Sequence, residues 1–229
     1  MVVAAIGFAT RGDDPAPSKA TADPVIPTVT AQDAKAIADQ LGPRDQELVN
    51  IGAKGVSIHR AGGARKYVAL TFDDGPGKDT ASILSILKQQ NVPATFFVLG
   101  EEVAANPQMV AQEVAGGNQV GIHSWDHADM TKQNAAAQQK EIEDTQTAVI
   151  NASGVASRLF RAPYGSVNPA VITAAERNKL LSVLWEVDTN DWQQPDPATI
   201  VQRVMSQVTP GSIILMHDGG GDRANTVAA

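Results

Sequence analysis

Strand-like and helix-like segments alternate through most of this chain of 229 residues, from residue 66 to the C-terminus. Short apolar runs predict strands at 67–72, 94–99, 119–122, 158–160, 181–187 and 212–216. Segments with a helical period predict helices at 80–90, 107–115, 134–150, 168–178 and 197–208. Strands that alternate with helices in this way are parallel. The pattern therefore predicts an α/β fold, either a (β/α) barrel or a doubly wound sheet.

The expected helix starts carry the residues that begin helices. Pro107 and Pro197 suit the first turn, where the missing N–H of proline is not needed. Asn168 suits an N-cap because its side chain can accept a hydrogen bond from a free backbone N–H of the first turn. These signals support the proposed boundaries of three helices.

Residues 1–30 differ from the rest of the chain. The first nine, "MVVAAIGFA", are apolar but too few to span a bilayer, and no basic residue precedes them as in a complete signal peptide. Residues 13–30 contain four prolines and few large apolar residues, so we expect a flexible tether that cannot form a core. An apolar start followed by a tether favours an exported protein, extracellular or associated with the cell wall, whose export signal is incomplete here.

Residues 31–65 are expected to lead into the main domain at 66–229. The run "TAQDAKAIADQLGP" predicts a short helix that begins with a capping box of Thr30 and Asp33 and ends at Gly42-Pro43. Residues 44–65 have four glycines and no clean period, so no regular element is predicted there.

The overall charge and the absence of cysteine exclude several classes of function. The chain has 18 Lys and Arg against 25 Asp and Glu, a net charge of −7, and no basic run. A partner with a phosphate backbone is therefore not expected. Without cysteine there can be no disulfide, thiolate metal site or cysteine nucleophile. Any bound metal must be held by histidine and carboxylate.

Ionisable residues follow five of the six predicted strands, at the point where each strand ends. They are Asp73 and Asp74, His123 and His127, Arg161, Asp188 and Asp191 with Trp192, and His217. Each group alone has an ordinary interpretation, such as turn chemistry for "DDGP" or a solvated helix face for the two histidines. However, the carboxyl ends of parallel strands share one edge of the fold, where ligands bind. We therefore expect these side chains to converge on one site.

Together these groups have the chemistry of metal-assisted hydrolysis. A carboxylate and two neutral imidazoles form a common catalytic zinc set, and only one of the two neighbouring aspartates need be a ligand. The other can act as a base, and Arg161 can hold it in position. His217 can donate a proton to a leaving group, because a nearby carboxylate would keep it charged near neutral pH.

The five segments "TFDDGP", "HSWDH", "RAPYG", "DTNDW" and "LMH", in this order, resemble the five motifs of the polysaccharide deacetylase family, the NodB-homology carbohydrate esterases of family 4. The resemblance covers residues 66–229. It implies a distorted (β/α) barrel of the NodB type, a divalent metal ion, and removal of acetyl groups from a sugar polymer. The expected metal is zinc, with cobalt or another divalent ion as alternatives.

The resemblance also implies a role for individual residues. Asp73 corresponds to the general base, tethered by Arg161, and His217 to the general acid, with Asp191 as its partner. The corresponding metal ligands are Asp74, His123 and His127. The backbone N–H of Tyr164 would help to hold the oxyanion, and Trp192 and Leu215 would line the pocket for the acetyl methyl group. Asp188 is expected to be structural.

Three functions remain open at this point. The first is removal of N-acetyl groups from N-acetylglucosamine in peptidoglycan or chitin-type polymers, and the second is an O-acetyl esterase acting on xylan. A non-catalytic sugar-binding module is the third, although such a module is expected to lose Asp73 or His217. Family members usually continue beyond "GDRANTVAA" with another helix, so we expect either a shortened sequence or a barrel without its last segment. The oligomeric state is open, with a monomer as the default.

Overall fold

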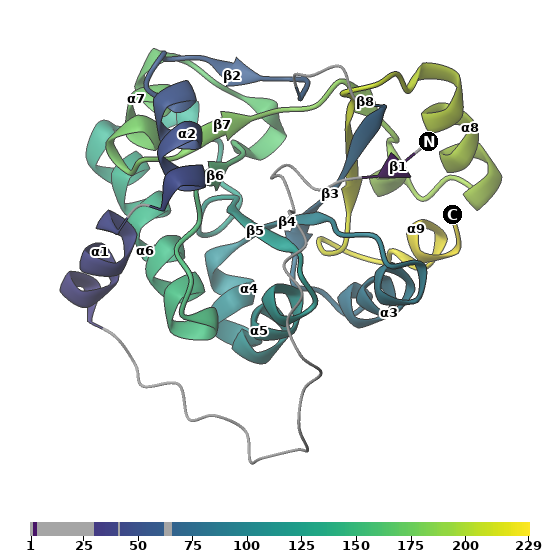
Figure 1. Cartoon of the computed structure of the whole chain (residues 1–229), viewed down its shortest axis with the longest axis horizontal. Helices are drawn as coiled ribbons and strands as arrows, with labels where there is room; N and C mark the ends of the chain where they lie inside the picture. The colour runs from purple at the N-terminus through teal and green to yellow at the C-terminus, as the bar shows by residue number, and fades with distance from the viewer. Residues whose placement is uncertain (1, 4–29, 41, 62–65) are drawn as a thin grey trace.

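The computed structural model of the chain describes residues 2–3, 30–40, 42–61 and 66–229. Within these ranges, nine strands form one sheet in the order β2-β7-β6-β5-β4-β3-β9-β8, with β1 paired to β3. Every pairing between these strands is parallel. The α/β fold expected from the alternation of strands and helices is confirmed (Figure 1).

The strands are short except at the centre of the sheet. Their bounds are β1 (Val2–Val3), β2 (Ser57–Ile58), β3 (Tyr67–Gly75), β4 (Thr95–Val98), β5 (Gln119–Ile122), β6 (Leu159–Phe160), β7 (Leu181–Val183), β8 (Val187–Asp188) and β9 (Ile213–His217). The longest, β3, pairs with both β4 and β9. The strand that ends in the two aspartates is thus held on both sides.

The sheet is strongly curled, which distinguishes a barrel from an open doubly wound sheet. Strand β7 lies near one end of the strand order and β8 at the other, yet only residues 184–186 join them. So short a connection requires the two ends of the sheet to approach each other. An antiparallel bridge between Arg60 and Ser212 and an ion pair between Arg60 and Glu186 also connect these ends. The expected distorted barrel is confirmed, and the doubly wound alternative is not what forms.

Helices cover the outside of this curled sheet (Figure 1). Their bounds are α1 (Ala31–Asp39), α2 (Pro43–Gly52), α3 (Thr80–Gln90), α4 (Gly100–Ala105), α5 (Pro107–Ala115), α6 (Ala135–Ser153), α7 (Pro169–Arg177), α8 (Pro197–Gln207) and α9 (Ala224–Ala228), with 3-10 turns at Met130–Lys132, Pro163–Gly165 and Asp191–Gln193. The largest apolar cluster lies between helices and sheet, and includes Phe72, Phe96, Ile142 and Phe160. Burial of this outer layer holds the helices against the strands.

The interior of the barrel has a smaller apolar cluster together with buried polar groups. Phe97, Leu159, Leu181, Val183 and Ile213 pack there. Because side chains alternate across a strand, Asp73 and His217 extend from β3 and β9 on the inner face, whereas their neighbours Phe72 and Met216 pack on the outer face. The strand pattern thus directs ionisable side chains inward at one end of the barrel.

Most of the expected helices match the structure closely. The predicted helices at 80–90 and 107–115 have the observed bounds, and Asn134, Asn168 and Thr30 are N-caps whose side chains accept backbone N–H groups. The strand expected at 181–187 is wrong as a single element, because the chain leaves β7 after Val183 and enters β8 at the far end of the sheet.

Some elements have no clear signal in the sequence. Residues 44–65 contain most of α2 and all of β2. The first helix ends at Asp39, before the Gly42-Pro43 pair that was expected to end it, and this pair instead begins α2, with Pro43 in its first turn. Helices α4 and α9 are also additions to the expected order. Each is short, which leaves little room for a helical period to appear.

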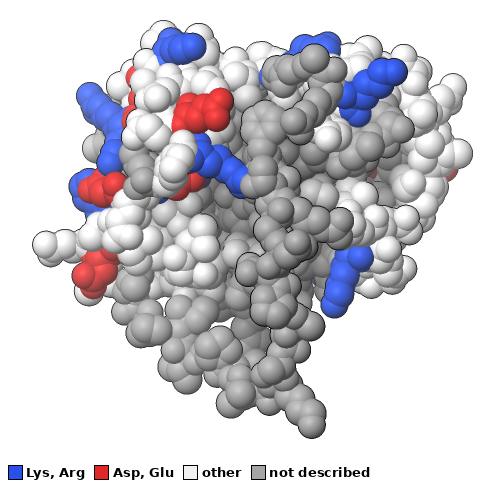
Figure 2. All heavy atoms as spheres, in the orientation of Figure 1, with Lys and Arg blue, Asp and Glu red and all other residues white. Residues whose placement is uncertain are grey.

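The expected tether at 13–30 and most of the apolar start lie outside the described residues, apart from Thr30 and the strand Val2–Val3. Among the described residues, no helix has the length and apolar character that crossing a membrane requires. On the face drawn in Figure 2, the described charged side chains are scattered and of both signs.

Candidate metal and catalytic site

The two neighbouring aspartates reach the same site because the end of β3 is irregular. The register with β4 shifts between Asp73 and Gly75, so Asp74 is an extra residue in the strand, a β-bulge. Asp74 also has a left-handed backbone, with φ of 70°. A regular strand would send the two side chains to opposite faces. The bulge instead places both carboxylates close to His123 Nε2, with Asp74 Oδ1 at 3.4 Å and Asp73 Oδ2 at 3.7 Å.

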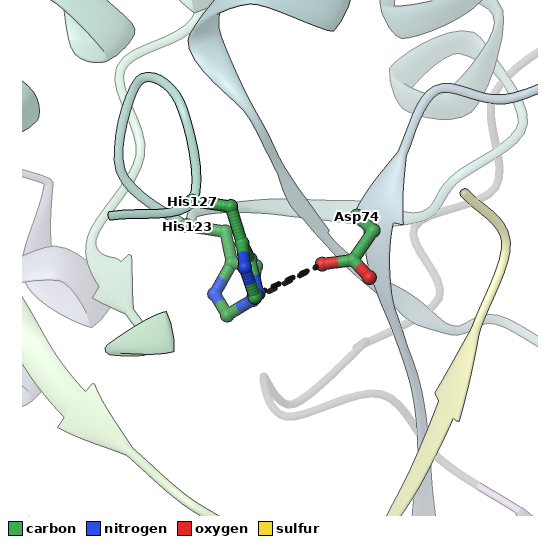
Figure 3. A group of neighbouring side chains, drawn as sticks. All are labelled: Asp74, His123 and His127. Atoms are coloured by element: carbon green, nitrogen blue, oxygen red, sulfur yellow. Dashed lines mark ion pairs between the residues drawn. The ribbon is translucent and has the colours of Figure 1, made fainter. Parts of the chain in front are cut away.

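The two histidines follow β5 and point toward Asp74 (Figure 3). His127 Nε2 lies 3.3 Å from Asp74 Oδ1, and the imidazole rings of His123 and His127 meet edge to face. The two histidines, four residues apart, lie in a loop and not on a helix, because no helix forms between them and His127 has φ of 63°. His123 Nδ1 lies 2.7 Å from the carbonyl oxygen of Arg161. A hydrogen bond donated there leaves the Nε2 lone pair directed at Asp74.

These three residues fit a divalent metal ion. One donor atom from each of Asp74, His123 and His127 lies within 4.8 Å of the others. Asp74 Oδ1 is buried and has no hydrogen-bond partner, which is costly for a carboxylate unless a cation binds it. In a tetrahedral zinc site with bonds of about 2.0–2.1 Å, neighbouring ligand atoms are about 3.4 Å apart. The separations from Asp74 Oδ1 to the two imidazole nitrogens, 3.4 and 3.3 Å, match that value.

The electrostatics of this cluster favour an ionised Asp74. Burial alone would raise the pKa of Asp74, but the surrounding imidazoles of His123, His217 and His127 lower it overall. Burial lowers the pKa of His127, and the charge of His123 lowers it further. His127 is therefore neutral near pH 7, as a metal ligand must be.

Arg161 holds Asp73 from within the barrel. Its side chain is completely buried, and Nη1 donates to Asp73 Oδ1 at 2.6 Å and to Thr71 Oγ1 at 2.8 Å. The remaining N–H groups donate to the carbonyl oxygens of Val183 and Leu184. Burial lowers the pKa of Arg161, partly offset by the charge of Asp73, but a guanidinium stays protonated at any physiological pH. Arg161 thus fixes the orientation of the Asp73 carboxylate.

On the other side of the site, His217 and Asp191 form a second pair. His217 Nδ1 lies 2.7 Å from Asp191 Oδ1, and the backbone N–H of His217 donates to Asp191 Oδ2 at 2.9 Å. Burial lowers the pKa of His217, but the hydrogen bond to Asp191 and the charges of Asp73, Asp191 and Asp74 raise it above its usual value. His217 is consequently suited to carry a proton near neutral pH.

The expected substrate-binding residues lie at or beside this cluster. The Tyr164 side chain is 66% exposed, and its ring centroid is 4.5 Å from that of His127. Leu215 is buried on β9, two residues before His217 and on the same face, while Trp192 is 53% exposed in the turn that begins at Asp191. Asp188 Oδ1 accepts the backbone N–H of Asn190, a local turn contact.

The sequence motifs did not identify the residues that brace the aspartate turn from behind. The Asp218 side chain, 1% exposed, accepts a hydrogen bond from Thr80 Oγ1, and its backbone N–H donates to the carbonyl of Asp73. A Cβ atom on Gly75 would lie 2.1 Å from Asp218 Oδ2, so only glycine fits at that position of the turn. Burial and the charges of Asp73 and Asp74 raise the pKa of Asp218 to about 7. The only sequence signal was its position directly after His217.

Sequence comparison links this geometry to known proteins. The profile of the polysaccharide deacetylase family matches residues 60–183, more than half of the chain. The peptidoglycan-N-acetylglucosamine deacetylase PgdA of Listeria monocytogenes is 45% identical over 154 residues, which are 67% of this chain and 32% of that protein. The chain thus matches about a third of the length of that relative. A chitooligosaccharide deacetylase of Sinorhizobium fredii is 38% identical over 76% of this chain and 82% of its own length.

Comparison of structures gives the same result. A family 4 carbohydrate esterase from Streptomyces lividans, solved in complex with acetate, superimposes with a TM-score of 0.68 and 41% sequence identity. The match covers 73% of this chain and 85% of the esterase. The similarity therefore extends over the barrel as a whole and is not confined to the site.

Proposed function

Because the chain belongs to the polysaccharide deacetylase family, we propose that it hydrolyses the N-acetyl groups of N-acetylglucosamine residues in a polysaccharide. The observation that carries this proposal is the arrangement of the site. An Asp-His-His cluster that fits a divalent ion lies between two separately supported ionisable groups, Asp73 on Arg161 and His217 on Asp191. Amide hydrolysis requires a base for water and an acid for the leaving nitrogen, and this site offers one of each.

Each residue has a defined task in this proposal. Asp73, oriented by Arg161, accepts the proton of the attacking water. His217 donates a proton to the nitrogen that leaves, while Asp191 keeps its imidazole charged and oriented. The backbone N–H of Tyr164 stabilises the negative charge that develops on the acetyl oxygen. Asp74, His123 and His127 would hold a divalent ion, which would supply Lewis-acid chemistry for the carbonyl and for the attacking water.

Zinc is the ion that we propose for this site, because two imidazoles and one carboxylate form a common catalytic zinc set. Elemental analysis of protein refolded with excess zinc should give about one ion per chain. The double variant His123→Ala, His127→Ala should hold much less. A circular-dichroism spectrum would show that the variant is folded, and undiminished zinc in a folded variant would disprove this ligand assignment.

The chemistry of the site and the activities of similar proteins support an N-acetylated polysaccharide as the substrate. Peptidoglycan and chitin-type oligomers both offer N-acetylglucosamine, and relatives that act on either are similar to this chain. An O-acetyl esterase acting on xylan would use the same residues with an alcohol as the leaving group. Both reactions would use this site, and a direct comparison of substrates distinguishes them.

Acetate release measured side by side on N-acetylglucosamine oligomers, peptidoglycan and acetylated xylan is the decisive experiment. We expect release from the two N-acetylated substrates, its loss with a chelator, and its return when zinc is added. An Asp73→Asn variant provides the matched blank for each substrate. Release from xylan alone would replace the proposal with the esterase, and no release from any of the three would favour a non-catalytic module.

We also propose that the protein acts outside the cytoplasm, at or near the cell wall. The apolar first residues and the proline-rich stretch at 13–30 support this, since an apolar segment followed by a flexible tether favours export. Cell fractionation of the producing organism, with antibody detection in the wall and culture fluid, tests it. Protein found only in the cytoplasmic fraction would contradict the proposal.

A further inference from the structure

The segment that follows His217 folds back over the site, although it belongs to none of the five motifs. It runs from Gly219 through a glycine-rich turn into α9, which contains Thr226. The glycines lie directly against the metal-ligand cluster, since a Cβ atom on Gly220 would lie 2.6 Å from Asp74 Oδ2. This segment therefore contacts the site at more than one point.

One of these contacts is made to Asp191, the partner of His217. The Asp191 side chain is 1% exposed, and Thr226 Oγ1 donates to its Oδ2 at 2.7 Å. The same oxygen accepts the backbone N–H of His217, and the other oxygen bonds the His217 ring. In an aspartate without partners, the terminal torsion of the carboxylate takes a broad range of values. Donors on both oxygens restrict it, so that Oδ1 faces the imidazole.

Helix α9 is itself fastened on two sides, so Thr226 is held in place. Asn225 Nδ2 donates to the carbonyl of Pro195 at 2.9 Å, which ties α9 to the loop that carries Asp191 and Trp192. Arg223 is buried, with 4% of the residue exposed. Its guanidinium donates to the carbonyls of Gly219 and Gly220, and the backbone N–H of Arg223 donates to the carboxylate of Asp79. A helix of five residues has little stability of its own, so these contacts define where Thr226 lies.

We propose that Thr226 is a positioning residue for the His217–Asp191 pair. Its hydroxyl fixes the rotation of the Asp191 carboxylate, and Asp191 in turn fixes the tautomer and direction of His217, so that Nε2 faces the leaving group. The inference rests on the proposed function, because it takes His217 to be the general acid. Thr226 lies behind Asp191 and acts through it. Its loss should affect turnover rather than substrate binding.

The test compares Thr226→Val, which keeps the side-chain shape without the hydroxyl, with Thr226→Ser, which keeps the hydroxyl. We expect Thr226→Val to lower kcat about tenfold, the usual effect of removing a supporting hydrogen bond from a functional group. KM for an N-acetylglucosamine oligomer and zinc content should stay unchanged, and Thr226→Ser should recover most of kcat. Thr147→Val is the control, because the Thr147 hydroxyl donates only within α6, to the carbonyl of Glu143.

Two kinetic results would overturn the inference. One is a Thr226→Val enzyme with the kcat of the unmodified protein. The other is a Thr226→Ser enzyme as slow as Thr226→Val, since packing rather than the hydroxyl would then matter.

A second readout keeps this test separate from the proposed function. The proton on His217 Nδ1 that faces Asp191 gives its own NMR resonance, which should shift or broaden in Thr226→Val and stay in place in Thr147→Val. If the unmodified protein releases no acetate but this resonance changes, the positioning role stands and the proposed reaction fails. An unchanged resonance in Thr226→Val would overturn the positioning role whatever the activity.

Discussion

Replacing Arg161 by methionine should destabilise the fold mainly by leaving Asp73 buried without its cation. Arg161 is completely buried, and Asp73 is 3% exposed. Methionine retains much of the side-chain volume but none of the hydrogen bonds to Asp73, Thr71, Val183 and Leu184. The Asp73 carboxylate is then buried without its charged partner, and the carbonyl groups of Val183 and Leu184 lose the donors that Arg161 supplied.

The size of this effect can be estimated from measurements on buried ion pairs. Removing one partner of such a pair typically costs about 3–5 kcal/mol. With a urea dependence of about 3 kcal/mol per molar for a domain of this size, the unfolding midpoint should fall by about 1–2 M. Replacing both charged partners by neutral groups is often close to neutral. The double variant Arg161→Met, Asp73→Asn should therefore lose at least about 2 kcal/mol less stability than the two single losses added together.

Urea denaturation of the unmodified protein, both single variants and the double variant measures this coupling. Arg158→Met is the matched control, because Arg158 is also buried and donates to the carbonyls of Ala38 and Gln40, far from Asp73 in the barrel. In a double variant, the loss of unfolding free energy from Arg158→Met and that from Asp73→Asn should add to within about 0.5 kcal/mol. If the losses from Arg161→Met and Asp73→Asn also add, the pair does not stabilise the fold as argued here.

Two further predictions concern activity. Asp73→Asn should abolish acetate release and keep the zinc, whereas Asp74→Asn should lose zinc first. Elemental analysis and the acetate assay measure both effects, and zinc loss in Asp73→Asn but not in Asp74→Asn would show that the two roles are reversed. His217→Ala should lower turnover at least about a hundredfold at unchanged zinc content, because it removes the general acid. Since only protonated His217 can donate, activity should be present below its raised pKa and disappear as the pH rises through it. In Asp191→Asn this alkaline limb should move to lower pH, and a limb that stays in place would point to another acid.

The sequence predicted the strand ends of the site because two independent signals coincide there. Apolar runs mark the strands, and rare ionisable residues lie where these runs end, as at Asp73 near the end of β3 and at His217, the last residue of β9. Helix boundaries that have a strong local signal were also predictable, such as the start of α5, which has Pro107 in its first turn. In these places local chemistry and the global fold favour the same structure.

Other features depend on the closure of the barrel and have no local signal. The run from Leu181 to Val187 is mostly apolar, with only Ser182 and Glu186 polar, and it has no Gly or Pro to indicate that residues 184–186 cross from one end of the sheet to the other. Helix α9 is too short to show a period, and the contact between Thr226 and Asp191 joins residues 35 positions apart in sequence. Such contacts follow from tertiary geometry alone.

The backbone of the site loops shows why the sequence could give the identity of these residues but not their arrangement. Among the described residues, eight that are not glycine have positive φ, and five of them lie in the loops of this site: Asp74, Ser124, His127, Tyr164 and Asn190. A glycine at such a position would adopt this conformation easily and would mark a turn in the sequence. Each such position costs on the order of 1–3 kcal/mol and persists only where its surroundings impose it. At Asp74 and His127 the side chain is needed for the cluster, so glycine is excluded. The conformation at Asp74 must therefore be imposed by contacts such as the hydrogen bond from the Asp218 N–H to the carbonyl of Asp73, which forms only when β3 and β9 lie side by side.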